Sequence, residues 1–305
     1  MNTTFTELVG GDAFVSAWMG LAVVSMVSLL FIDAPYGRHQ TTGWGPTTSA
    51  RLGWVIMETP ALLIMAGLFI AGDRFDDVAL WIYVLMWCIH YFHRSWIYPC
   101  RARIAGKTMP LAISGMGAFF QTVNSTLNGE HLFLLERAPG KDWLSDPRLW
   151  IGLAIFILGM ICNIHSDTVL LNLRKDRDVA AAAAAAAEEG VPLAPEPEPE
   201  AEPEAEPESK SESAPEPEPA PEPEAGGGYV IPRGGMFRYV SAPNYLGEMM
   251  EWLGFAIATW SLTGLSFFVW TVANLGPRAF ANHRWYKDRF PDYPADRRAL
   301  IPCLC

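Results

Sequence analysis

A glutamate and a tyrosine lie inside long apolar stretches of the sequence, where polar side chains are costly and usually serve a function. The glutamate, Glu58, shares a helical face with Trp54, and Pro60 leaves a nearby backbone carbonyl without its helical partner. Loss of solvent favours the protonated form of a carboxyl group, so Glu58 could stay neutral and donate a hydrogen bond. The alternative is a glutamate that lines a water-filled crevice or pairs with a neighbouring helix.

The tyrosine, Tyr91, stands in the run HYFHR at residues 90–94. A helix here would place Tyr91, Arg94 and Tyr98 on one face, and a buried tyrosine hydroxyl needs a hydrogen-bond partner. The alternative is an aromatic belt at the membrane surface. The histidines of this run do not predict a metal site, because the chain has 6 His and no adjacent His-His pair. Membrane di-iron enzymes use several such clusters.

Two more apolar segments carry polar residues at helical spacing. Steps of about 100° per residue place Asn163, Asp167 and Arg174 within about 40° of one another on a helix. A second polar face follows later in the chain, at Asn244, Glu248 and Glu251. Two such faces at the ends of neighbouring helices could line a pocket for a polar ligand.

The C-terminal tail contributes side chains that suit phosphate groups. They are Arg278, Arg284, Tyr286, Arg297 and Arg298. Anchoring of the chain by positive charge at the membrane surface would explain many of them without a ligand. No Gly-rich loop of the Rossmann or P-loop type is present, so a nucleotide would have to be bound by the helices themselves.

The segments that must position these residues are helices long enough to cross a membrane. A span needs about 20 apolar residues. The sequence predicts seven spans, of which the last two are short: Phe14 to Ile32, Gly53 to Ala71, Val78 to Tyr98, Met109 to Leu127, Leu149 to Leu170, Leu246 to Trp260 and Leu265 to Leu275. We therefore expect an all-α, polytopic membrane protein.

The distribution of lysine and arginine predicts its orientation. With the N-terminus outside, 18 of the 22 Lys and Arg fall on the inner side and 4 on the outer side. Because cytoplasmic loops carry the excess of positive charge, we expect the C-terminus in the cytoplasm.

An acidic segment interrupts this pattern. Residues 176–228 carry 16 Asp or Glu against two cations and repeat Pro-Glu after eight alanines. Repelling charges and proline prevent a core, so we expect an extended, disordered cytoplasmic insert, either a spacer or a docking segment. It would separate residues 1–175, with five spans, from residues 229–305, with two spans and a basic tail, within one membrane domain.

Seven short segments occur in an order that covers nearly the whole chain apart from the insert. They are PYGRH at 35–39, the Glu58 segment, HYFHR at 90–94, NIHSD at 163–167, GGMF at 234–237, NYLGE at 244–248 through Glu251-Trp252, and DYP at 292–294 to Ile301-Pro302. Together they resemble the steroid 5-alpha-reductase (3-oxo-5-alpha-steroid 4-dehydrogenase) family, most of all its type 2 enzyme.

The resemblance implies a seven-helix reductase that uses NADPH, bound on the cytoplasmic side, to saturate the 4,5 double bond of a 3-oxo-steroid. Glu58 and Tyr91 would hold the 3-oxo group. The cofactor would be lined by Tyr36, Trp54, Asn163, Asp167, Arg174, Asn244, Glu248, Arg278, Tyr286 and Arg297. The sequence departs from the family's pattern at Val230, where Arg is usual, and at Asn282, where His is usual.

The implied chemistry agrees with these residue types. Hydride addition to the β-carbon of an enone leaves negative charge on the carbonyl oxygen, which neutral Glu58 and Tyr91 would stabilise. Water or a nearby acid would protonate the α-carbon. The expected partners are the lipid bilayer and a 3-oxo-4-ene steroid or related lipophilic enone, without nucleic acid, metal or an obligate protein partner. The alternatives are an S-adenosylmethionine-dependent membrane methyltransferase of the isoprenylcysteine type and a non-enzymatic scaffold or transporter.

Overall fold

The computed structural model describes residues 11–31, 43–102, 104, 106–135, 139–188 and 229–304. Long helices dominate this part of the chain. The α-helices are α2 (Asp12–Phe31), α3 (Ala50–Gly72), α4 (Val78–Phe92), α5 (Tyr98–Arg101), α6 (Leu111–Gly129), α7 (Pro147–Glu188), α8 (Pro243–Thr259) and α9 (Leu262–Arg289). Within the described residues, each of the seven predicted spans is mostly helical, so the helical structure of these segments is confirmed.

Shorter elements connect the helices. Two π-helical turns, His93–Ile97 and Glu130–Leu134, follow α4 and α6, and two 3₁₀ turns cover Lys141–Ser145 and Gly235–Arg238. Strands β1 (Thr47–Ser49) and β2 (Thr108–Pro110) pair antiparallel, with Thr48 opposite Met109. This small sheet is a departure from the all-α expectation. It holds the beginnings of α3 and α6 side by side.

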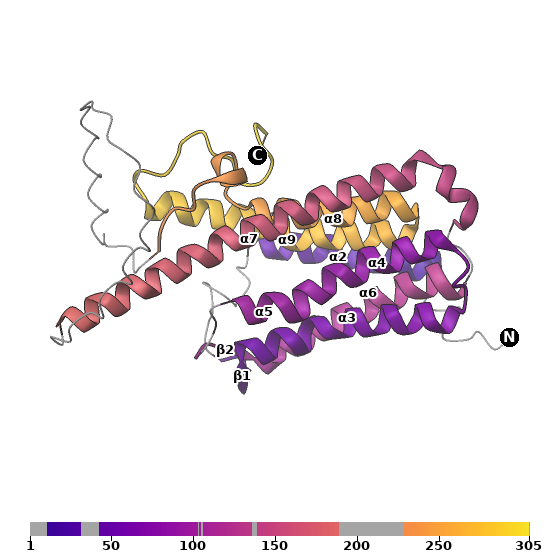
Figure 1. Cartoon of the computed structure of the whole chain (residues 1–305), viewed down its shortest axis with the longest axis horizontal. Coiled ribbons are helices and arrows are strands. Elements are labelled where there is room, and N and C mark those ends of the chain that lie inside the picture. Colours follow the sequence, from indigo (N-terminus) through magenta and orange to yellow (C-terminus); the bar gives the residue numbers. More distant parts are fainter. Residues whose placement is uncertain are drawn as a thin grey trace, which may run out of the picture.

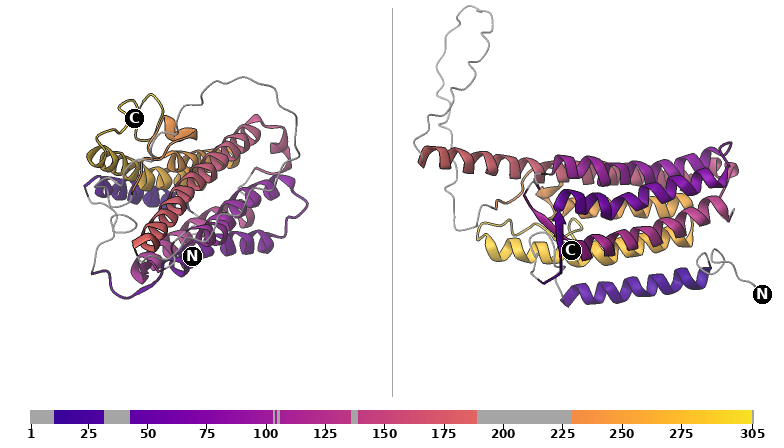
Figure 2. Two further views of the ribbon diagram at one scale, coloured as in Figure 1. Left: turned by 60° about the vertical axis from the view of Figure 1, so that its left-hand side comes forward. Right: turned by 90° about the horizontal axis from the view of Figure 1, so that it is seen from below.

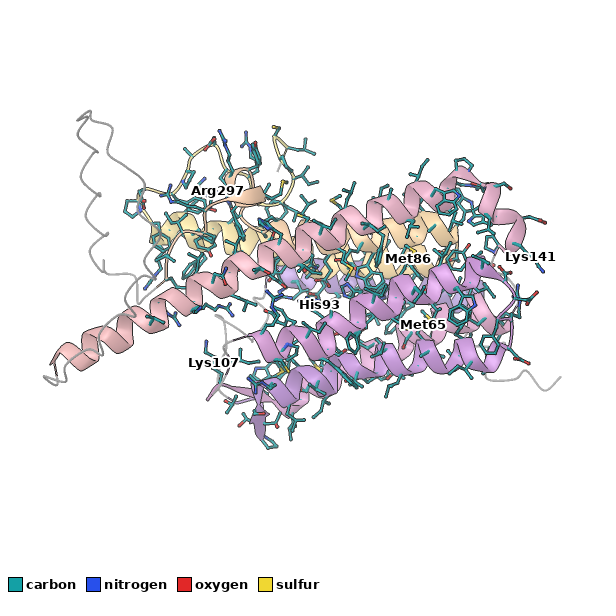
Figure 3. The ribbon with its side chains drawn as sticks, viewed as in Figure 1. Met65, Met86, His93, Lys107, Lys141 and Arg297 are labelled. Carbon is teal, nitrogen blue, oxygen red and sulfur yellow. The ribbon has the colours of Figure 1, made fainter. Side chains whose placement is uncertain are left out.

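The helices form a bundle in which they run along one another (Figures 1 and 2). Helix α7 packs mainly on α8, α8 on α9, α9 on α2, and α3 on both α4 and α6. We call the end that carries β1 and β2 the sheet end, and α7 extends beyond the bundle there (Figure 1). Lys107 and Arg297 lie toward this end and Lys141 lies at the opposite end (Figure 3).

Local signals in the sequence fix where several helices begin. The Ser49 side chain accepts a hydrogen bond from the backbone N–H of Leu52 at the start of α3. Asp77 caps α4 in the same way through the N–H of Ala79. Such caps satisfy backbone donors that have no partner within the helix, which is why these helices begin where they do.

The bundle buries an aromatic centre and exposes an apolar exterior. Trp87, Trp252, Phe255 and Phe267 are almost fully buried and belong to one cluster. Large aliphatic side chains point outward, among them Leu63 on α3, which is 61% exposed. Within the described residues, three helices are long and apolar enough to cross a membrane, namely Asp12–Phe31, Ala50–Gly72 and Pro147–Lys175. The outward apolar surface is that of a membrane protein.

Glycines bring α7 and α8 into backbone contact. A Cβ atom built on Gly159 would lie 2.6 Å from the carbonyl oxygen of Gly247, and one built on Gly247 would lie 2.5 Å from the backbone nitrogen of Asn163. No side chain fits at such distances. Small residues at a helix interface permit this close approach, which is common in membranes.

Two expectations need correction. Residues 176–188 were expected in a disordered loop, whereas α7 continues as a helix to Glu188. The eight alanines explain the difference, because alanine has the highest helix propensity. The rest of the predicted insert, residues 189–228, lies outside the described residues. The expected tail is also partly helical, since α9 runs on beyond the last predicted span to Arg289.

Candidate functional site

A cavity of about 320 Å³ opens at the sheet end of the bundle. Its walls come from segments far apart in the sequence, which include the start of α3, the π-helical turn after α4, the loop before β2, the middle of α7, the start of α8 and the later part of α9. Residues 229–232 cover one side. A volume of this size falls within the range of ligand pockets, roughly 300–1,000 Å³.

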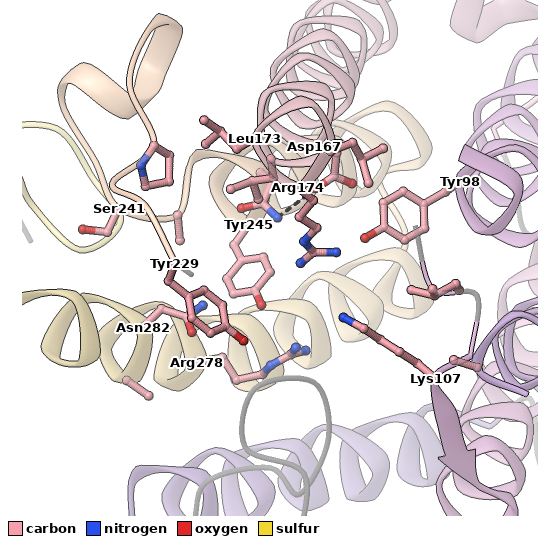
Figure 4. A pocket seen from close by; sticks show the side chains of 18 of the residues that line it. Tyr98, Lys107, Asp167, Leu173, Arg174, Tyr229, Ser241, Tyr245, Arg278 and Asn282 are labelled. Carbon is pink, nitrogen blue, oxygen red and sulfur yellow. Dashed lines mark hydrogen bonds between the residues drawn. The ribbon is translucent and has the colours of Figure 1, made fainter. Parts of the chain in front are cut away.

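The lining of the cavity is strongly cationic. Lys107, Arg174 and Arg278 point from three different segments toward the same open space, and Tyr229 and Tyr245 lie beside them (Figure 4). Arg94 and Arg177 also belong to the lining, so its described residues include five cations against one carboxylate, Asp167. A concave surface with this charge suits a ligand that carries phosphate groups.

The single carboxylate is tied to its neighbours. The side-chain amide of Asn244 donates a hydrogen bond of 3.0 Å to Oδ1 of Asp167 (Figure 4). The guanidinium of Arg94 lies 3.6 Å from Oδ2 of Asp167 and 3.8 Å from Glu248. These contacts join α4, α7 and α8 at the inner wall of the cavity.

Arg94 is also enclosed by aromatic rings. Its guanidinium carbon lies 4.8 Å from the ring centre of Trp54 and 5.1 Å from that of Tyr98. It stands in the π-helical turn that follows α4, and such turns shift the helical register at functional sites. The shared face of Tyr91, Arg94 and Tyr98 in the sequence contained this signal, although Arg94 and Tyr98 were not among the predicted cofactor residues.

Glu58 and Tyr91 lie deeper than the cavity. Trp54 and Arg94 belong to its lining. Glu58 lies about one helical turn after Trp54 on α3, and Tyr91 lies about one turn before Arg94 on α4, so both are farther from the sheet end. Only 6% of Glu58 and 2% of Tyr91 is exposed. The two side chains are joined through Gln121 of α6, whose Oε1 accepts from the Tyr91 hydroxyl at 2.9 Å. Its Nε2 donates to Oε2 of Glu58 at 2.7 Å.

A second buried pair lies beside this group. His90 Nδ1 is 2.7 Å from Oε2 of Glu251, and both residues are almost fully buried. The rings of His90 and Tyr91 are 4.9 Å apart between centres. Glu251 therefore pairs with a histidine in the bundle and is not part of the cavity lining, although its sequence spacing suggested one face with Asn244 and Glu248.

The outer rim of the cavity contains a histidine network outside the predicted spans. Ser241, a lining residue, has its Oγ 2.6 Å from Nδ1 of His283 and 2.6 Å from the hydroxyl of Tyr293. Burial lowers the pKa of His283 below its usual value, and the cations Lys287, Arg297 and Arg298 lower it further. The neutral imidazole is thus the form that the folded rim favours.

The structure brings together six of the ten predicted cofactor residues. Those that line the cavity are Trp54, Asp167, Arg174, Asn244, Arg278 and Tyr286. Asn163 is buried against α8, one helical turn deeper on α7 than Asp167. Glu248 is not a lining residue but contacts one, because its carboxylate lies 3.8 Å from the guanidinium of Arg94. Arg297 is buried behind the rim, where its Nη1 donates to the Tyr293 hydroxyl at 3.4 Å. Tyr36 lies outside the described residues.

The cavity also contains residues that the sequence interpretation did not assign. Val230 and Asn282, the two departures from the family's pattern, both line it. Four further lining residues are Lys107, Tyr229, Ser241 and Tyr245. Their residue types and spacing did not distinguish them in the sequence as cavity residues. Gln121 was missed too, although a polar residue inside a predicted span was the rule that identified Glu58.

Comparison with known proteins gives a consistent result along the chain. The family model described as "3-oxo-5-alpha-steroid 4-dehydrogenase" matches residues 107–185 and 222–305. The steroid 5-alpha-reductase DET2 of Gossypium hirsutum is 35% identical over 288 residues, covering 93% of each chain. The 3-oxo-5-alpha-steroid 4-dehydrogenase 1 of Bos taurus is 34% identical over 96% of each chain. The Homo sapiens protein of that name is 34% identical over 89% of this chain and 86% of its own. The expected special likeness to the type 2 enzyme stays a prediction.

Proposed function

The chain belongs to the 3-oxo-5-alpha-steroid 4-dehydrogenase family of membrane oxidoreductases of steroid metabolism, and on this basis we propose that it reduces the 4,5 double bond of a 3-oxo-4-ene steroid with NADPH. One observation carries the proposal beyond the family. A cationic cavity that suits phosphates lies about one helical turn from a buried carboxyl and phenol, Glu58 and Tyr91, that suit a carbonyl oxygen.

The cavity residues fit a phosphorylated dinucleotide. Lys107, Arg174 and Arg278 would bind its phosphates, and the surplus of cations favours the additional 2′-phosphate of NADPH over NADH. Tyr229 and Tyr245 offer aromatic faces for its rings. When bound, NADPH supplies a hydride.

Glu58 and Tyr91 would act on the substrate. Both are buried and both can present a proton to an oxygen atom. Their donors would stabilise the negative charge that develops on the 3-oxo oxygen during reduction, as an oxyanion hole does. A low-dielectric surrounding strengthens such hydrogen bonds, and the aromatic cluster around Trp87 and Trp252 supplies it.

The apolar exterior supports delivery of the steroid from the bilayer. We propose that seven helices cross the membrane, namely α2, α3, α4, α6, α7, α8 and α9, with the N-terminus outside. The sheet end would face the cytoplasm, because 18 of 22 lysines and arginines fall on that side. NADPH would then enter the cavity from the cytoplasm. Residues 1–175 and 229–305 would form one membrane domain, and residues 176–228 would be an insertion at its cytoplasmic end.

The direct test is turnover by the purified protein in lipid nanodiscs. Incubation with NADPH and a 3-oxo-4-ene steroid should yield a steroid heavier by two hydrogens, with loss of absorbance at the reduced nicotinamide band. Thermal stabilisation should occur with NADPH and not with S-adenosylmethionine, which separates a reductase from a methyltransferase. A folded protein that binds neither ligand and forms no reduced steroid would contradict the proposal and favour a scaffold.

A further inference from the structure

Gln121 occupies the space between the two residues proposed to act on the substrate. It belongs to α6, whereas Glu58 belongs to α3 and Tyr91 to α4, so three helices meet at one amide group. Gln121 is 8% exposed. Its two hydrogen bonds, 2.9 Å from Tyr91 and 2.7 Å to Glu58, use both ends of the amide.

The direction of these bonds limits what Tyr91 can do. A tyrosine hydroxyl has one proton, and that proton is donated to Oε1 of Gln121. The amide carbonyl of Gln121 therefore takes the place, relative to the phenol, that a substrate carbonyl would need. A ketone oxygen can accept the Tyr91 proton only if it replaces Gln121 as the acceptor.

The other end of the amide limits Glu58. Oε2 of Glu58 accepts from Nε2 of Gln121, so in a neutral carboxyl group the proton would reside on the other oxygen, Oε1. Oε1 takes no part in the contact with Gln121. The contact with Gln121 thus orients the carboxyl group and leaves one oxygen available.

We infer that Gln121 is a positioning residue whose amide carbonyl holds the Tyr91 hydroxyl in place until a substrate carbonyl oxygen displaces it, while its amide N–H keeps Glu58 oriented. This inference rests on the proposed function. Gln121 would then affect both the affinity for the steroid and the rate of its reduction. Substrate binding exchanges one acceptor of the Tyr91 proton for another, which reduces the net gain in affinity. Orientation of Glu58 is needed at the reacting oxygen and affects turnover.

Substitution of Gln121 by methionine tests this, because methionine has a similar length and offers no strong hydrogen bond. In Q121M the Tyr91 hydroxyl would lack a partner in the free enzyme, so a 3-oxo-4-ene steroid should bind about 3- to 10-fold more tightly. A steroid of the same skeleton without the 3-oxo group should bind as it does to the wild type. The kcat for the enone should fall by about tenfold or more, and NADPH affinity should stay within about twofold.

Two controls separate positioning from a general loss of structure. Asn128 is a buried amide on the same helix whose Nδ2 donates to the backbone of Asn124, so N128L removes a buried polar group away from the pair. It should leave steroid affinity unchanged. In a Y91F background, Q121M should no longer tighten enone binding, because the hydroxyl that it releases is absent.

The outcomes are distinct. Wild-type turnover with unchanged affinity and rate in Q121M would overturn the role of Gln121 and leave the proposed function intact. Two results would show a structural role only and also overturn the inference. One is weaker binding of both steroids in Q121M. The other is an equal change in enone affinity when Q121M is made with and without the Tyr91 hydroxyl. Absence of enone reduction by the wild type would overturn the proposed function and this inference with it.

Discussion

Asn244 donates a 3.0 Å hydrogen bond to Asp167, and this bond ties α8 to α7 at the wall of the cationic cavity. Asp167 is 4% exposed and also faces Arg94 at 3.6 Å. Asp167, the one carboxylate among the described residues of the lining, is thus engaged by the protein itself, and the cations Lys107 and Arg278 remain directed at the cavity.

The Asp167 contact can be tested by its shape-conserving variant. D167N keeps an oxygen that can accept from Asn244 and should lower the free energy of unfolding only slightly. D167L leaves the Asn244 amide and Arg94 without this partner and should lower it by about 1–3 kcal/mol. Thermal unfolding in nanodiscs measures both. Equal stability of the two variants would show that the bond contributes little.

Cofactor preference should depend on the cavity cations. R174A and R278A should each raise the KM for NADPH by about tenfold, because each removes a charged partner of a phosphate. Arg284 is exposed on α9 and does not line the cavity, so R284A serves as the matched control. Steady-state kinetics with NADPH and NADH measure the effect. Comparable kcat/KM for the two cofactors in the wild type would contradict the 2′-phosphate assignment.

Glu58 and Tyr91 should control the rate and not cofactor binding. E58A and Y91F should each lower kcat by roughly 10²-fold, as loss of an oxyanion donor does. E58Q keeps a donor without titrating, so substantial residual activity would support a neutral Glu58. Tyr83 lies on the same helix and donates to the backbone of Pro139, so Y83F is a suitable control. Wild-type rates in both E58A and Y91F would refute the assignment.

Acid should weaken the rim of the cavity through His283. Its pKa is lowered in the folded protein, so the unfolded chain binds more protons once the pH falls below the ordinary histidine range. Stability should therefore decline as the pH is lowered from 7.5 to 5.5. H283N removes this titration and should show a smaller decline. Unfolding temperatures of both proteins across this pH range test the expectation, and parallel curves would argue against it.

Removal of residues 190–225 should preserve turnover. Glu58, Tyr91 and Gln121, which are proposed to act on or near the substrate, lie outside that range. The family model also leaves residues 186–221, most of this range, unmatched. Enone reduction by a well-folded deletion variant measures this, and a large loss of activity would assign the segment a task.

The sequence predicts the helices well because a membrane span leaves a long apolar run. It also predicts residues that share one helix, such as Asp167 and Arg174, which both line the cavity. It predicts poorly what depends on several helices at once. The contacts of Gln121 with Tyr91 and Glu58 exist only because α3, α4 and α6 pack together, which the sequence of one helix does not show. The end of α7 was predicted too early because the Pro-Glu repeats that follow the alanines led us to assign the whole segment as disordered.

The glycine contact between α7 and α8 determines which wall of the cavity can open. At Gly159 and Gly247 the two backbones touch, so neither helix can slide or roll against the other without a collision. The cavity wall formed by Asp167 and Asn244 therefore keeps a fixed geometry. We expect any movement that admits the proposed dinucleotide to occur in other parts of the lining, such as the segment before α8 that contributes Tyr229, Val230 and Pro232.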